Sequence, residues 1–147
     1  GVGVLGLQLL GYKSPGRIAR GLAVLDRATC DWEQPIGPNP IYHWYYITQA
    51  KRLGGGKCWD LWNRQFAPEL TSHQIIMAGA SDDGKDLGYW ESASAREHCK
   101  SRVYNTTLCT LSLEVYYKVG GFEDPPQDAA RSEIEDPDDI PLLFIDV

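Results

Sequence analysis

The sequence feature that most constrains the fold is a run of three glycines between two segments rich in aromatic residues. Residues 41–63, IYHWYYITQAKRLGGGKCWDLWN, hold three tyrosines and three tryptophans around this run. Apolar residues recur at helical spacing on both sides of the glycines, and a glycine run ends a helix. The pattern predicts two helices joined by a sharp turn. Their aromatic side chains either form the packing surface of a helical hairpin or line a ligand-binding cavity.

Helical periodicity is present in five segments, which apolar residues cover in two different ways. Three segments are apolar on two sides, namely residues 1–11, 41–53 and 101–119, and two are apolar on one side, residues 16–27 and 57–72. A helix with two apolar sides is covered on both, whereas a one-sided helix borders solvent. The alternation along the chain predicts an all-α fold of stacked αα hairpins, with one helix layer inside the other.

The remaining stretches set the expected domain boundaries. Residues 28–40 and 74–100 lack helical periodicity and are expected to be long loops, and Pro68 is expected to kink its helix or to end it early. We expect a helical domain over residues 1–121 and an extended acidic, Pro-rich linker and tail over 122–147. The last residues, IPLLFIDV, are expected to dock as an extended strand on a partner or on another part of the protein.

The first helical segment begins at Gly1 without a preceding capping residue. We therefore expect the chain to be a segment of a longer protein. Its net charge of −6 argues against a nucleic-acid partner, which needs clustered Lys and Arg. No apolar run approaches the roughly 20 residues that span a bilayer.

Four cysteines, at positions 30, 58, 99 and 109, lack the spacing of a metal site. Cys109 lies within an apolar helical run and is expected to be buried as a small apolar residue. The other three are expected to form one disulfide or none, so the cysteines leave the cellular compartment open.

Three strings in the chain are similar to one known superfamily. They are Tyr-x-Trp-Tyr-Tyr … Gly-Gly … Trp-x-x-Trp-Asn within 42–63, Gly-Tyr-Trp at 88–90, and RVYNTTLCTLSLEVYY at 102–117. They resemble the terpenoid cyclase and protein prenyltransferase superfamily, and in particular the prenyltransferase/squalene oxidase repeat proteins of planctomycete-type bacteria. The resemblance implies that residues 1–119 form an arc from the C-terminal part of an α/α toroid. It also implies that Gln74 and residues 88–90 belong to a glutamine-tryptophan type loop, which ties neighbouring hairpins together.

Within residues 1–119, the strings that carry chemistry in that superfamily and in other isoprenoid enzymes have no convincing match. Residues 82–86, DDGKD, spell the aspartate-rich motif that holds Mg²⁺-diphosphate in isoprenoid synthases of another fold. The glycines around them predict a turn, so a solvated turn or a weak Ca²⁺ site is the better interpretation. The DxDD acid motif of the cyclases is absent from 1–119.

Zinc and nucleophile chemistry find no better support. His98 and Cys99 are candidate zinc ligands, but adjacent side chains diverge and no Asp-x-Cys partner is present. No nucleophile motif lies near the histidines, which are His43, His73 and His98. The sequence therefore predicts no catalytic residue, no metal site and no cofactor.

The aromatic residues divide into two groups. Tyrosines on the expected inner helices are candidates to line a lumen or to contact an apolar ligand: Tyr42, Tyr45, Tyr46, Tyr104 and Tyr116. The others are expected to be structural packing residues: Trp44, Trp59, Trp62, Phe66 and Trp90. Packing is the favoured interpretation, because a buried aromatic ring contributes a large apolar area to a core.

The favoured function hypothesis is a non-catalytic toroid scaffold or interaction module. Other segments of the same protein, or a protein partner, would complete its helical arc. Two alternatives are a fragment of a cyclase or prenyltransferase whose catalytic residues lie outside this chain, and a module that binds an apolar ligand such as an isoprenoid.

Overall fold

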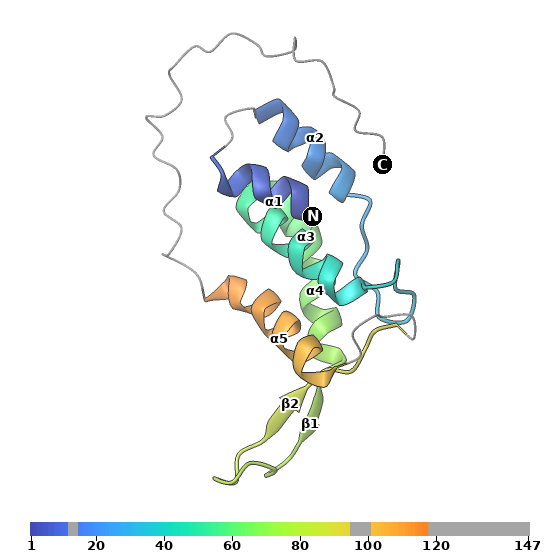
Figure 1. Ribbon diagram of the computed structural model, residues 1–147, viewed down its shortest axis with the longest axis vertical. Coiled ribbons are helices and arrows are strands. Elements are labelled where there is room, and N and C mark those ends of the chain that lie inside the picture. Colours follow the sequence, from blue (N-terminus) through green and yellow to red (C-terminus); the bar gives the residue numbers. More distant parts are fainter. Residues whose placement is uncertain (12–14, 95–100, 118–147) are drawn as a thin grey trace, which may run out of the picture. The chain divides into compact units, whose positions relative to one another are not determined.

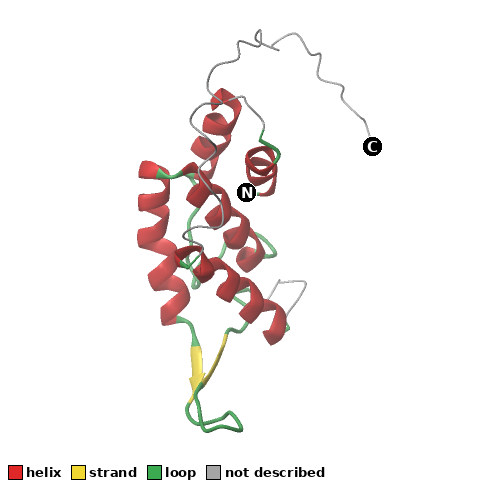
Figure 2. Cartoon of the chain, turned by 90° about the vertical axis from the view of Figure 1, so that its left-hand side faces the viewer, coloured by secondary structure: helices red, strands yellow, loops and turns green. Residues whose placement is uncertain are grey.

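The computed structural model describes residues 1–11, 15–94 and 101–117, and in these residues the protein is mostly helical (Figures 1 and 2). The α-helices are α1 Val2–Leu9, α2 Pro15–Leu25, α3 Pro40–Gly54, α4 Gly56–Ser72 and α5 Arg102–Leu113. A 3₁₀ turn, Glu114–Tyr116, follows α5, and the strands β1 Ile75–Met77 and β2 Leu87–Tyr89 form a hairpin. The coarse prediction of a helical protein is confirmed. The predicted tail, 122–147, and the residues His98 and Cys99 lie outside the described residues.

Helix α3 is the element around which the other helices pack. It contacts α1, α2, α4 and α5, and its buried residues include Ile41, Trp44 and Ile47. Pro40 begins the helix, where its fixed φ and missing N–H are tolerated. The positive φ of Gly55, 62°, turns the chain into α4, since glycine adopts this conformation without a Cβ clash. The predicted helical hairpin across the glycines is therefore present.

Helix α4 buries one face, as its one-sided pattern predicts. Trp62, Phe66 and Leu70 are buried, whereas Leu61 is 47% exposed. The helix continues through Pro68 to Ser72, so of the two effects expected of Pro68, a kink or an early end, the early end was wrong. Pro68 is exposed and near the C-terminal end. There a proline removes a single helical hydrogen bond close to carbonyls that are unpaired in any case.

The first and last helices depart from the expected two-sided burial. Helix α1 contacts α3 and α2, but it buries none of its residues. In the last segment, 101–119, each predicted apolar stripe is buried only in part: Cys109 and Val115 are buried, whereas Tyr117 is 86% exposed. The expectation was therefore wrong for α1 and partly met in the last segment, because an apolar pattern shows what a helix is suited to bury but not which neighbours are present.

The stretch 74–100, expected to be a loop, contains the β-hairpin. Its strands pair antiparallel, with Ile75 opposite Tyr89 and Met77 opposite Leu87. Trp90, directly after β2, is buried, and its indole N–H donates to the Leu70 carbonyl at 2.7 Å. This hydrogen bond fixes the base of the hairpin to the end of α4.

Candidate functional site

Four of the five tyrosines proposed to face a cavity are neighbours on α3 and α5. The ring centroids of Tyr42 and Tyr46 are 4.7 Å apart, and those of Tyr45 and Tyr46 are 5.0 Å apart. A hydrogen bond with Tyr42 is the largest cause that raises the pKa of Tyr46, followed by burial and by the neighbouring hydroxyls, that of Tyr104 among them. All four side chains are half-buried. We call this group the tyrosine cluster.

The fifth tyrosine, Tyr116, lies apart from the cluster and packs on α4. Its ring stacks on Phe66 with a centroid distance of 6.2 Å, and its centroid is 6.3 Å from that of Trp59. Its hydroxyl donates to the side-chain oxygen of Asn63. Burial raises the pKa of this hydroxyl. Tyr116 therefore joins the packing aromatics rather than the tyrosine cluster.

The residues predicted to pack are placed in the core or against it. Trp44, Trp62, Phe66 and Trp90 are buried, and Trp59 packs against this core while half-buried. The indole N–H of Trp44 donates to the Thr29 carbonyl at 3.0 Å, and that of Trp62 donates to the Thr48 hydroxyl at 2.8 Å. A buried indole whose N–H has a partner is stable as a packing group.

A half-buried ion pair, which the sequence pattern did not reveal, connects α3 with the end of α2. The Nζ of Lys51 lies 2.8 Å from the Asp26 carboxylate, and the Lys51 side chain is only 3% exposed. The same ammonium lies 5.4 Å from the centre of the Trp62 ring. The available signal was a lysine on a helix that is otherwise apolar on two sides, because a buried cation needs a counter-ion.

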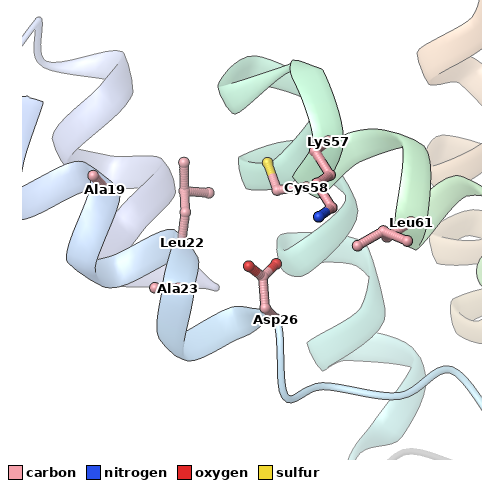
Figure 3. Close-up of a pocket in the computed structure, with 7 residues that line it drawn as sticks. All are labelled: Ala19, Leu22, Ala23, Asp26, Lys57, Cys58 and Leu61. Atoms are coloured by element: carbon pink, nitrogen blue, oxygen red, sulfur yellow. The ribbon is translucent and has the colours of Figure 1, made fainter.

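A cavity of about 490 Å³ lies beside this ion pair, between α2 and the first half of α4 (Figure 3). Its lining comprises Ala19, Leu22, Ala23, Asp26, Lys57, Cys58 and Leu61. In Figure 3 the Asp26 carboxylate points into the gap between the two helices. Burial and the neighbouring Asp26 carboxylate raise the pKa of the Cys58 thiol. That thiol donates to the Gly55 carbonyl at 3.0 Å. We call this cavity the α2–α4 groove.

The other candidates for chemistry occupy ordinary structural positions. His73 stacks on Trp32 with a centroid distance of 5.0 Å, and its Nδ1 lies 2.9 Å from the Glu69 carbonyl. Residues 82–86 form the tip of the hairpin, where Lys85 binds the exposed Asp83 carboxylate. Among the described residues, Cys30 and Cys58 are free thiols, and no group of three His, Cys, Asp or Glu residues is arranged to hold a metal ion.

Within the described parts of the chain, the helices are too short or too polar to span a bilayer. Comparisons of the chain with protein-family models, with curated proteins and with solved structures gave no match. The likeness to the α/α-toroid superfamily stays a hypothesis that rests on the sequence strings alone.

Proposed function

We propose that the protein is a non-catalytic interaction module that receives a further helix on the open side of α1. Another segment of the same protein, or a protein partner, supplies this helix and thereby extends the helical arc. The observation that carries the proposal is the exposure of α1, a helix whose residues are apolar with one exception and of which none is buried.

The surface of α1 suits close contact with another helix. Val2 is 51% exposed, Leu9 is 56% exposed, and Leu10, which follows the helix, is 84% exposed. A Cβ atom added to Gly3 or Gly6 would meet no other element within 4 Å. Gln8, the one polar residue of α1, already has a hydrogen-bond partner within the protein, because its side-chain amide donates to the Ala50 carbonyl at 3.1 Å. Contiguous apolar surface of this kind marks an interaction site.

The order of the helices supports the same proposal. α3 has α1 and α5 as neighbours, and it also contacts α2 and α4. In an arc of αα hairpins, the first, third and fifth helices form one layer, and the second and fourth form the other. A helix added beside α1 would continue the row that α5, α3 and α1 begin.

Photo-crosslinking of the protein in its source cells tests this proposal. A benzoylphenylalanine placed at Leu10 is expected to crosslink to one helical segment, whereas the same group at the exposed Thr107 on α5 is not. The denatured mass distinguishes the two sources. A chain heavier than 16.4 kDa indicates a segment of the same protein, and a chain of that mass with a second polypeptide indicates a partner. Equal crosslinking at the two positions, or none at Leu10, would overturn the proposal.

A second candidate function, binding of an apolar ligand, is favoured by the tyrosine cluster. Half-buried aromatic rings close together offer apolar faces and hydroxyl groups to one molecule. We expect Tyr104→Ala to weaken binding of farnesol, measured by calorimetry. The matched control is Tyr117→Ala, which removes a tyrosine that is 86% exposed on the same segment. If the two variants bind farnesol as the wild type does, the cluster is a packing feature.

A further inference from the structure

The α2–α4 groove combines an apolar base with a basic edge. Ala19, Leu22 and Ala23 from α2 and Leu61 from α4 are the apolar residues that line the groove (Figure 3). Ala19, Ala23 and Leu61 are exposed, so these apolar side chains border solvent. The cavity volume of about 490 Å³ lies within the range of about 300–1,000 Å³ that is typical of ligand sites.

The charges at the edge of the groove are predominantly positive. The one carboxylate in its lining, that of Asp26, is balanced by the Lys51 ammonium 2.8 Å away. Lys57 lines the groove and is exposed. Helical spacing places Arg64 on α4 near Leu61, since residues three apart are neighbours on a helix surface.

Two further cations lie beside the groove lining. Arg20 lies on α2 three residues before Ala23, and Arg27 follows Asp26 in the turn after α2; both arginines are exposed. Asp60 is the acidic residue on the facing stretch of α4. The edge therefore carries an excess of positive charge, although the whole chain has a net charge of −6.

We propose that the α2–α4 groove binds a short acidic segment of a partner protein, with aliphatic or aromatic side chains in the apolar base and carboxylates at the basic edge. The negative charge that we propose for the segment follows from charge complementarity. The four cations at the edge would repel a basic segment. They attract an acidic segment, although the chain as a whole is acidic. This proposal does not depend on a partner at α1, because the groove and the α1 face are lined by different residues.

Fluorescence anisotropy with a labelled peptide of sequence DLDLLFDL tests the proposal on the full chain. We expect saturable binding that weakens as salt is raised, because exposed charges at the edge are screened. Reversing two edge charges, Lys57→Glu with Arg64→Glu, is expected to weaken binding by about tenfold. Filling the base with Ala23→Gln is expected to weaken it as well. The control, Lys85→Glu at the hairpin tip, reverses one charge rather than two, at a residue whose side chain is 81% exposed, and is expected to leave binding unchanged.

Two further arms make every outcome decisive. The neutral peptide NLNLLFNL is expected to bind more weakly than the acidic peptide, which separates charge recognition from general apolar adhesion. To exclude competition from acidic residues of the chain itself, the titration is repeated with Asp136→Asn, Asp138→Asn and Asp139→Asn combined. The proposal is overturned if neither the wild type nor the triple Asp→Asn variant binds the acidic peptide. It is also overturned if Lys85→Glu weakens binding as much as the edge variants, or if salt has no effect on binding.

Discussion

Lys51 lies on the most buried helix of the protein, and its charge is balanced by a carboxylate from another helix segment. Its side chain is 3% exposed, whereas that of Asp26 is 47% exposed, so the pair joins the interior to the surface. Removing one partner of a fully buried ion pair costs roughly 3–5 kcal/mol, because the remaining charge is left without compensation. Water that reaches the Asp26 side of the pair reduces this cost.

Asp26→Asn should therefore lower the free energy of unfolding by about 1–3 kcal/mol, because the Lys51 ammonium loses its counter-ion while it stays buried. Urea denaturation measures the change. The double variant Asp26→Asn with Lys51→Met is expected to recover much of the loss, since the buried charge is then absent. Asp60→Asn, on the exposed side of α4, is the control and is expected to change stability by no more than about 0.5 kcal/mol. Equal effects of Asp26→Asn and Asp60→Asn would contradict this account.

The thiol of Cys58 is expected to react slowly, because burial and Asp26 raise its pKa. Only the thiolate is nucleophilic, and a raised pKa leaves a smaller fraction of Cys58 as thiolate near pH 8 than in a free cysteine. Its rate of alkylation by iodoacetamide should keep rising with pH beyond the range in which an unfolded cysteine has levelled off. Peptide mapping against pH, in buffer and in urea, measures both states. Equal rates in the two conditions would show that the folded protein does not protect Cys58.

At the scale of the element, α4 has one buried face and one exposed face. Phe66 is 0% exposed and contacts Trp62, Trp59 and Tyr116, whereas Leu61 is 47% exposed. Phe66→Ala is expected to cost about 3–5 kcal/mol, because it leaves a cavity among rigid aromatic rings. Leu61→Ala, the matched control five residues earlier on the exposed side, is expected to cost less than about 1 kcal/mol. Thermal and urea unfolding measure both changes, and similar costs would refute the one-sided assignment of α4.

Element boundaries could be predicted where the chain carries a strong local signal. Pro40 begins α3, and the glycines at 54–56 end it and start α4, so this hairpin follows from the sequence alone. The β-hairpin could not be predicted, because its strands have three residues each and alternation does not stand out over so short a run. Trp90, which fixes the base of this hairpin, was predicted as a packing residue. Its acceptor, the Leu70 carbonyl, could not be predicted, because it lies 20 positions earlier in the chain.

The tyrosine cluster shows where prediction from spacing ends. Tyr42, Tyr45 and Tyr46 are three and four residues apart, so an α-helix places them on one face regardless of the rest of the fold. Tyr104 joins them because α5 packs on α3, which is a tertiary contact. Tyr116 is apart from them because it lies 12 residues after Tyr104 in the chain, which is about 18 Å along a helix axis. There its ring packs on Phe66 of α4. The ion pair of Lys51 depends in the same way on the packing of α2.

At the scale of the whole molecule, the helices leave one large apolar element uncovered. α1 packs on α3 and on α2. A Cβ atom on Gly1 would meet Tyr46 of α3, and a Cβ atom on Gly21 of α2 would meet Val4 of α1. These contacts cover one side of the helix and leave Leu9 and Leu10 in solvent. Isolated exposed apolar residues are common, but a contiguous patch on one helix favours association.

We expect the purified chain to self-associate through α1 as its concentration rises, since the described residues leave this apolar face exposed. Leu9→Gln with Leu10→Gln should abolish this association and leave the unfolding free energy nearly unchanged, because both residues are already exposed. Sedimentation velocity over a concentration series measures the association. The control is Val103→Gln, which alters an isolated apolar residue that is 76% exposed on α5 and should leave association as it is. A wild-type chain that stays monomeric throughout the series, or one that Val103→Gln disperses equally well, would show that the α1 face does not mediate self-association.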